Sequence, residues 1–371
     1  MPEGKREYGT SQGETYWNWF CCIPKLTYAQ REILLKCFGS PEALWRASER
    51  ELAYLEEKGF AFLAEVKKFR QENPPEKTEH TVKSLGIQFT SYENDHYPGR
   101  LRELSGRPHG LFWKGKIPGE DTKTAAVVGA RECTPFGKET AEELARGIAR
   151  AGGAVVSGAA YGVDGAAQLS ALLAGGESVA VLGCGTDVRY PSGNSKLFDL
   201  LERQGTLVSE YPPGTPPRRY HFPVRNRIIS GLSDVTVVVE ARKRSGSLIT
   251  AGFAAEQGRE VYAVPGRPGD PLSEGCNELI SQGAGIFLSA ESFLKAFFPE
   301  KTGQKKWCKE DLTLAPAEKL VYSSLDLHSK TLWELAECTG LSLSELGSSL
   351  LSLEGKGYIQ ETEQNTFALR K

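Results

Sequence analysis

The sequence lacks the residue spacing of a metal site. Its 371 residues include five histidines and eight cysteines, but no C-x-x-C pair and no cysteine spaced from a histidine as zinc ligands are. We therefore expect no metal and no cofactor. The cysteines are Cys21, Cys22, Cys37, Cys133, Cys184, Cys276, Cys308 and Cys338.

Long hydrophobic runs are lacking as well. No stretch approaches the ~18 consecutive apolar residues of a membrane-spanning helix. The first residues, MPEGKREYGTSQGETY, have neither the apolar core of a secretory signal nor an arginine-rich amphipathic pattern. We expect no membrane association and a cytoplasmic location with reduced thiols.

A large excess of charge of one sign is also lacking. The formal net charge is −2, from 45 basic and 47 acidic residues. Any role in binding an anion must therefore depend on local clusters of basic residues. The chain is longer than one hydrophobic core usually requires, which predicts two or three domains.

Three zones of different composition are present. Residues 14–75 place apolar side chains at helical spacing and predict a small helical domain. Residues 82–299 alternate short β-branched runs with helical patterns, and residues 312–371 contain three helical patterns and a hairpin, typical of a winged-helix domain. The polar stretches QENPPEKTEH near residue 75 and PEKTGQKKWCKEDLTLAP near residue 305 predict solvated linkers.

The middle zone predicts an α/β fold with a doubly wound parallel sheet. Strands that are apolar on both faces and separated by helices pair in parallel. Several end in Gly or Ser just before a helix, at the edge where such sheets bind ligands. The stretch 82–118 predicts an extension packed on the sheet. The expected strands are TAAVVGA from 124, AVVSG from 154, SVAVLG from 178, TLVSEY from 206, VTVVVEA from 235, VYAVPG from 261 and GIFLS from 285.

A basic loop carries the strongest functional signal. Four arginines lie within ten residues around Phe222 without an acid among them, and three more basic residues follow one strand later. We expect a helix to begin near Ile228, which would hold these arginines at the sheet edge, where they could bind phosphates while Phe222 stacks on a base. A solvated charged face, with Phe222 in the core, is the alternative. The basic residues are Arg218, Arg219, Arg225, Arg227, Arg242, Lys243 and Arg244.

Two turns of small residues precede helices, at Ser157–Gly158 and at Ser245–Ser247. Backbone N–H groups and the helix dipole could face an anion there. The alternative is that these residues only allow close packing, but the neighbouring arginines favour anion binding. The turn from Gly129 to Gly137 is too long for a phosphate-binding P-loop and lacks its hydroxyl residue, so we do not expect nucleotide hydrolysis.

The middle zone resembles the DprA (Smf) family of DNA-processing proteins. The resemblance covers about residues 124–298, in family order and spacing. It implies an extended Rossmann fold that binds single-stranded DNA, forms a homodimer and helps load the RecA recombinase during natural transformation. The motifs are VVGAR, SGAAYGVD, VAVLGCGTDVRYPSGN, LVSEYPPGTPP, HFPVRNRIISGLSDVTVVVEA, SGSLITA and AVPG.

The resemblance also implies DNA-binding residues. The arginine of the family's first-strand turn corresponds to Arg131, and its DNA-facing aromatic corresponds to Phe222. Tyr161 and Gln168 depart from the family pattern, so any contact made by their counterparts is in doubt here. The candidate DNA-binding residues are Gly129, Arg131, Ser157, Gly158, Arg219, Phe222, Arg225, Asn226, Arg227, Arg242, Ser245, Gly246 and Ser247.

Other functions fit the sequence less well than single-stranded DNA binding does. A related group of Rossmann-like phosphoribohydrolases uses a PGGxGTxxE turn, whereas SGSLITAGFAAE lacks its paired glycines and the spacing of its acid. We therefore expect a protein without enzymatic activity. A protein that acted only as a structural adaptor would not require the cluster of arginines. The third helix of the winged-helix zone, Ser342 to Lys356, is poor in basic residues, so we do not expect it to read duplex DNA.

Overall fold

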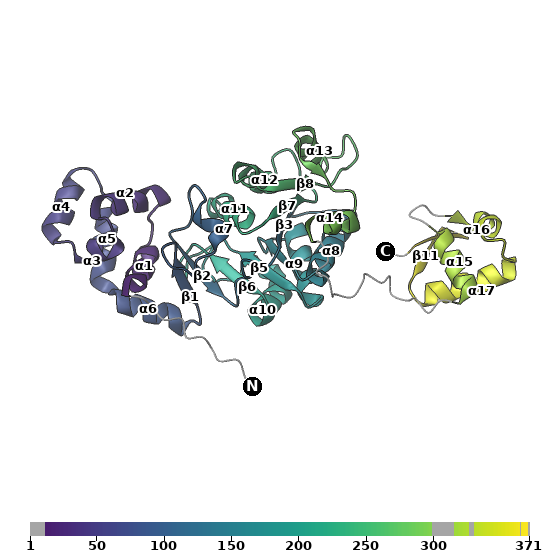
Figure 1. The fold of residues 1–371 in the computed structure, drawn as a ribbon, viewed down its shortest axis with the longest axis horizontal. Helices are drawn as coiled ribbons and strands as arrows, with labels where there is room; N and C mark the ends of the chain where they lie inside the picture. Colours follow the sequence, from purple (N-terminus) through teal and green to yellow (C-terminus); the bar gives the residue numbers. More distant parts are fainter. Residues whose placement is uncertain (1–11, 299–314, 326–329, 364, 370–371) are drawn as a thin grey trace. The chain divides into compact units, whose positions relative to one another are not determined.

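The chain divides into two compact units, Met1–Glu300 and Lys301–Lys371. The computed structural model describes residues 12–298, 315–325, 330–363 and 365–369 (Figure 1). The predicted helical zone and the α/β zone both lie in the first unit. The linker predicted near residue 305, Cys308 and the first residues of the predicted winged-helix domain lie outside the described residues.

Six helices form the N-terminal part of the first unit. Two of them begin with reciprocal hydrogen bonds. The side chains of Thr27 and Ser48 each accept the backbone N–H of the third helical residue, whose side chain accepts the backbone N–H of the capping residue. Trp19, Phe20 and Leu34 are buried where the helices meet. The helices are α1 (Gln12–Cys22), α2 (Tyr28–Phe38), α3 (Pro41–Arg46), α4 (Glu49–Glu57), α5 (Leu63–Glu72) and α6 (Pro75–Ser84).

The linker predicted near residue 75 is wrong, because the second half of QENPPEKTEH begins helix α6. Pro75 is the first helical residue, where its fixed φ suits the helix and its missing N–H costs no hydrogen bond. Thr78 and Val82 are buried on this helix, which packs against α1. The polar composition of the stretch concealed this buried side.

Nine strands form one sheet in the order β1-β2-β6-β5-β4-β3-β7-β8-β9. From β6 to β9 all neighbours are parallel, whereas β1 and β2 add an antiparallel pair at the β6 edge. The predicted doubly wound α/β fold is confirmed. The strands are β1 (Gln88–Ser91), β2 (Gly110–Lys114), β3 (Thr124–Val128), β4 (Ala154–Ser157), β5 (Glu177–Val181), β6 (Thr206–Ser209), β7 (Val235–Val238), β8 (Glu260–Ala263) and β9 (Gly285–Ile286).

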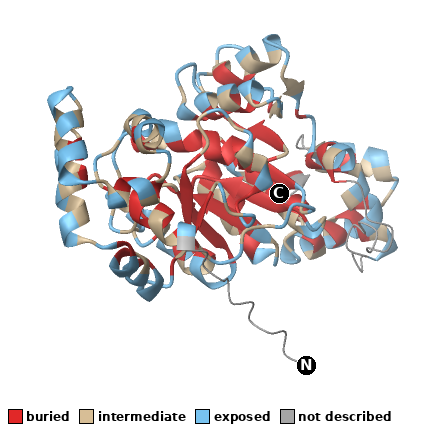
Figure 2. Ribbon diagram, turned by 60° about the vertical axis from the view of Figure 1, so that its left-hand side comes forward, coloured by how far each residue is buried: buried red, intermediate tan, exposed pale blue. Residues whose placement is uncertain are grey.

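Helices cover both faces of this sheet (Figure 1). Burial from both sides explains why the strands are continuous runs of Val and Ala, and Figure 2 shows the sheet as a buried layer. One face holds α8 (Pro135–Arg150), α9 (Val163–Leu173), α10 (Ser195–Gln204) and α14 (Ala290–Phe297). The other holds α7 (Gly99–Arg102), α11 (His221–Gly231), α12 (Gly246–Glu256) and α13 (Glu274–Ser281).

The winding of the sheet reverses at β3. Strands β4, β5 and β6 follow on one side of it, and β7, β8 and β9 follow on the other. Loops leave such a reversal in opposite directions and open a crevice at the carboxyl ends of the strands. The candidate residues that follow β3, β4, β6 and β7 are therefore gathered at one edge of the sheet.

The described residues of the second unit form three helices and a small antiparallel sheet. The helices α15 (Pro316–Ser324), α16 (Leu332–Thr339) and α17 (Leu343–Gly355) precede the strands β11 (Ile359–Glu363) and β12 (Thr366–Leu369), as predicted. The short strand β10 (Lys330–Thr331), which the sequence did not predict, pairs with β12. Among the described helices of both units, none combines the length and the apolar character needed to cross a bilayer.

A buried histidine joins the N-terminal helices to the sheet. His109 precedes β2 and is 6% exposed, and its Nε2 lies 2.7 Å from Glu32 Oε1 on α2. Its ring is 4.8 Å from that of Tyr28 and 6.0 Å from that of Phe20, measured between centroids. Burial lowers the pKa of His109, against the opposing effect of Glu32. The neutral imidazole is therefore the form that the fold accommodates.

This burial predicts an acid sensitivity of the first unit. Because the folded-state pKa of His109 is below its unfolded value of about 6.5, its contribution to stability is full above that pH and is lost as the pH falls. Between about pH 6.5 and pH 5, the melting temperature of His109→Gln should fall less than that of the wild type, as measured by thermal unfolding. His80→Gln, at an exposed position on α6, should follow the wild type. Parallel curves for all three proteins would contradict this.

Candidate functional site

An exposed arginine and a half-buried phenylalanine share the carboxyl edge of the sheet. Arg131 lies in the loop between β3 and α8, and its side chain is exposed. Phe222 lies in the first turn of α11, against Gly183 of the loop after β5. The Arg131 guanidinium carbon is 5.8 Å from the centroid of the Phe222 ring, within reach of a cation–π interaction. Two candidates far apart in the sequence therefore form one surface.

Arg225 lies beneath this surface. The helix start expected near Ile228 is wrong, because α11 already begins at His221 and places Arg225 in its second turn. Pro223 concealed this start, although proline is tolerated in a first turn, where N–H groups have no helical partner. The Arg225 guanidinium is 4% exposed and donates to the carbonyl oxygens of Gly158, at 3.0 Å, and Val181. Burial lowers the pKa of Arg225 to about 10.

Asn226 and Arg227 are buried as well. The Asn226 amide donates to the Gly246 carbonyl at 3.1 Å and so joins α11 to the start of α12. Arg227 Nη2 is 2.6 Å from Glu210 Oε2, and the two side chains are 10% and 14% exposed. Both predicted DNA contacts therefore have partners inside the protein.

The turn after β4 uses its own donors internally. The N–H of Gly158 donates to Asp164 Oδ2 at 3.1 Å, and the N–H of Ala159 donates to Gln168 Oε1 at 2.8 Å. The Ser157 hydroxyl donates to the Val127 carbonyl at 2.7 Å. Burial raises the pKa of Asp164, and the charge of Arg225 opposes that shift. The Ser157 hydroxyl and the Gly158 N–H, both predicted to face an anion, therefore already have partners within the chain.

The turn Ser245–Ser247 is more open. Ser245 caps α12, and its Oγ accepts the Ser247 N–H at 3.4 Å and lies 2.7 Å from Ser247 Oγ. Gly246 is exposed, with open space where a side chain would be. Arg242 is exposed just before this turn. An anion could reach this helix start and its neighbouring cation.

A carboxylate of the chain also occupies the crevice where the winding reverses. Glu240 follows β7 and is 6% exposed, and it accepts the N–H of Thr134 at 2.8 Å as well as its hydroxyl. Thr134 in turn caps α8. Nucleotide phosphates bind at this helix start in many doubly wound sheets. On the other side of the loop, Gly129 lies close to Val163, which a side chain at 129 would overlap.

The remaining candidates lie on the surface, and sequence reasoning missed some residues nearby. Arg218 and Arg219 are exposed before α11. Tyr190, which was missed, has its ring centroid 5.4 Å from that of Phe222. Glu240 and Glu210 were also missed, because their partners, Thr134 and Arg227, lie 106 and 17 residues away and leave no local pattern. Within the described part of the chain, no group of His, Cys, Asp and Glu side chains could hold a metal ion.

Comparison with known proteins gives consistent matches. Residues 88–298 match the family described as DNA recombination-mediator protein A. The chain is 43% identical over 212 residues to the DNA processing protein DprA of Streptococcus pneumoniae, an alignment that covers 57% of this chain and 75% of that protein. It is 36% identical over 286 residues to the protein Smf of Escherichia coli, covering 75% and 76%.

Two solved structures are also similar. The X-ray structure of DprA from Streptococcus pneumoniae has a TM-score of 0.63 at 34% identity, and the match covers 76% of this chain and 98% of that one. DprA from Helicobacter pylori, studied for its single-stranded DNA binding mode, has a TM-score of 0.52 at 31% identity. That match covers 57% of this chain and 96% of the other.

The loop before α9 provides a test of how tightly this edge is packed. Gly162 has a φ of +73°, and a Cβ there would lie 2.2 Å from the Ala130 carbonyl oxygen. Gly162→Ala should lower the free energy of unfolding by at least about 2 kcal/mol, because it adds left-handed strain and backbone overlap. Urea unfolding measures this. Gly252→Ala, at an exposed helical position with open space, should be neutral or stabilise by up to about 1 kcal/mol. Equal losses would contradict the packing.

Proposed function

Because the chain belongs to the DNA recombination-mediator protein A family, we propose that it binds single-stranded DNA without sequence preference at the carboxyl edge of its sheet. The observation that carries the proposal is the exposed Arg131 guanidinium, 5.8 Å from the half-buried ring of Phe222. An arginine holds a phosphate while an aromatic face stacks on a base, and every base has such a face. The binding is therefore tolerant of sequence.

We assign the phosphate contacts to exposed groups. Arg131, Arg219, Arg242 and the turn Ser245–Ser247 offer donors at the surface, and Phe222 offers its ring. The other candidates support this surface from beneath. They are Gly129, Ser157, Gly158, Arg225, Asn226 and Arg227.

Stacking on Phe222 requires an unpaired base, because stacking between neighbouring base pairs hides the base faces in a duplex. We do not propose that the second unit recognises duplex DNA. Its helix α17 carries Glu345 and Glu354, which would repel a phosphate backbone. Single strands are thus the preferred ligand.

The protein acts in this proposal without catalysing a reaction. The rival function, processing of a nucleotide as in the phosphoribohydrolase-like group, needs a place for a terminal phosphate at a helix start. In that group the helix start follows the PGGxGTxxE turn, which corresponds here to SGSLITAGFAAE at the start of α12, and this segment lacks the paired glycines and the spacing of the acid. Release of free base from a nucleoside monophosphate would reverse this conclusion.

We further propose that the bound strand is passed to a RecA recombinase, in the cytoplasm, during DNA uptake or recombination. The support is membership of a family described as recombination mediators. A sequence-tolerant binder suits that role, since incoming strands have no common sequence.

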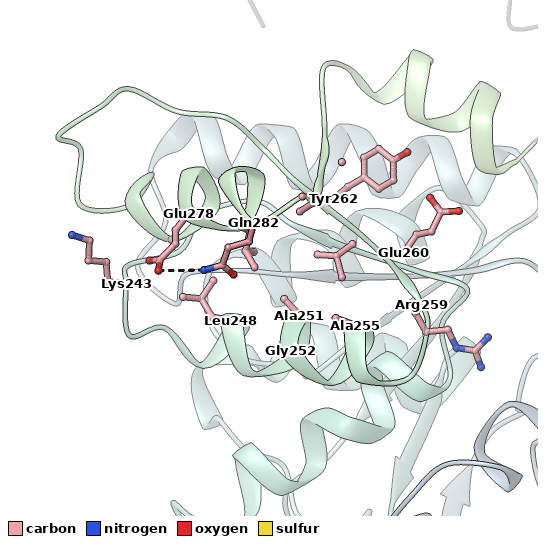
Figure 3. A pocket seen from close by; sticks show the side chains of 16 residues that line it. Lys243, Leu248, Ala251, Gly252, Ala255, Arg259, Glu260, Tyr262, Glu278 and Gln282 are labelled. Atoms are coloured by element: carbon pink, nitrogen blue, oxygen red, sulfur yellow. Dashed lines mark hydrogen bonds between the residues drawn. The ribbon is translucent and has the colours of Figure 1, made fainter.

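The proposed homodimer would use the β9 edge of the sheet. A groove of about 660 Å³ lies there between α12 and α13 (Figure 3). Beside it, β9 is a two-residue edge strand, followed by Leu288, which is 78% exposed, while Ile286 is 49% exposed. An open edge with exposed apolar side chains is suited to pairing with a second copy.

Salt dependence tests the proposed DNA contact. Each phosphate neutralised on a single strand contributes a slope of about −0.7 to log affinity against log salt. Arg131→Ala should weaken binding to all sequences alike and reduce the magnitude of the slope by about 0.7. Fluorescence anisotropy of a labelled oligonucleotide at several salt concentrations measures both quantities.

The matched control is Arg50→Ala, which removes an exposed arginine from α4, away from the carboxyl edge. It should leave both affinity and slope unchanged. If the wild type binds with no dependence on salt, or if the two variants behave alike, the proposed contact is wrong.

The dimer proposal has its own test. Leu288→Glu should convert a dimeric wild type into a monomer, because it places a charge on the apolar edge, and light scattering would report the mass. Leu173→Glu changes an equally exposed leucine on α9 and should remain dimeric. A monomeric wild type, or a dimeric Leu288→Glu variant, would refute this interface.

A further inference from the structure

Two tyrosines are exposed next to the proposed DNA site. Tyr161, in the loop after β4, is 45% exposed, and Tyr190, in the loop after β5, is 39% exposed. Single exposed aromatics are common on protein surfaces. These two, however, are held in place by neighbouring loops at the ligand-binding edge of the sheet.

Specific contacts fix the Tyr161 ring. Its hydroxyl accepts the N–H of Gly193 at 3.2 Å. A side chain on Gly193 would lie 2.7 Å from that hydroxyl, so the close approach needs glycine. Asn194 holds the same two loops together, because its amide donates to the carbonyls of Ala159 and Ala160 at 3.0 and 2.9 Å. The ring is therefore presented by rigid backbone, at little cost in side-chain entropy.

Contacts between neighbouring residues connect both tyrosines to Arg131 and Phe222. The Tyr190 ring is 5.4 Å from Phe222, and the Phe222 ring is 5.8 Å from the Arg131 guanidinium. Tyr161 is connected to Arg131 through the backbone. The next residue, Gly162, is so close to Arg131 that a Cβ on Gly162 would lie 2.5 Å from the Arg131 carbonyl oxygen. The Tyr190 ring thus adjoins Phe222, and the loop that carries Tyr161 adjoins the loop that carries Arg131.

We propose that Tyr161 and Tyr190 extend the Phe222 site into a stacking track for successive unpaired bases of one DNA strand. This inference rests on the proposed single-stranded DNA binding. The cation of Arg131 beside the rings selects a strand with phosphates, and the rings require bases. An apolar protein partner would satisfy the rings but would leave the exposed guanidinium without an anion.

The test compares two ligands that share a phosphate chain. One is a single-stranded oligothymidylate of about 12 nucleotides, and the other is an abasic strand of equal length. Tyr161→Ala should lose about fivefold or more in affinity for the oligothymidylate and little for the abasic strand. Tyr190→Ala should behave in the same way. Tyr161→Phe keeps the ring but removes its hydrogen bond to Gly193, so it should lose less affinity than Tyr161→Ala does. Arg131→Ala should lose affinity for both strands.

The controls separate this inference from the function on which it rests. Tyr54→Ala removes a tyrosine on α4 that is 58% exposed and should bind both strands as the wild type does. If the wild type binds neither strand, the proposed function itself fails. If the wild type binds but Tyr161→Ala and Tyr190→Ala keep its affinity, or lose it equally for both strands, the stacking track is refuted.

Discussion

The carboxyl edge of the sheet depends on one buried guanidinium. Arg225 donates to carbonyls at the ends of two neighbouring strands, those of Gly158 after β4 and Val181 in β5. The carboxylate of Asp164 compensates its charge in this buried region. Because a buried charge without partners is costly, these contacts must form together. Helix α11 carries Phe222 in its first turn and Arg225 in its second, so the helix that holds the loops in place also presents the ring.

Acidic side chains decide which helix starts remain open to a ligand. Asp164 accepts the N–H of Gly158, and Glu240 accepts the N–H of Thr134, so carboxylates of the chain occupy the turns before α9 and α8. The turn at Gly246 is left open to solvent. The groups left accessible at this edge include the guanidinium of Arg131 and the half-buried ring of Phe222. Such a surface fits a polymer that lies across it.

The sequence was sufficient for the framework, because continuous apolar runs and helical spacing are local signals. The strands β3 to β9 and the order of the three C-terminal helices follow from them. The roles of the arginines were not predictable locally. The local sequence around an arginine that precedes an apolar pair is the same whether its side chain faces solvent or a buried acid. Arg227 contacts such an acid, Glu210, which lies 17 residues earlier. The contact between Glu240 and Thr134 spans 106 residues and left no local pattern.

The central claim is that rings and cations at this edge bind unpaired DNA. Competition at fixed salt tests it most directly, with a labelled single strand on the protein and unlabelled single strand or matched duplex as competitor. The account predicts that the single strand displaces the label at far lower nucleotide concentration than the duplex does. Equal displacement by both would contradict it, because stacking on Phe222 requires bases that a duplex does not expose.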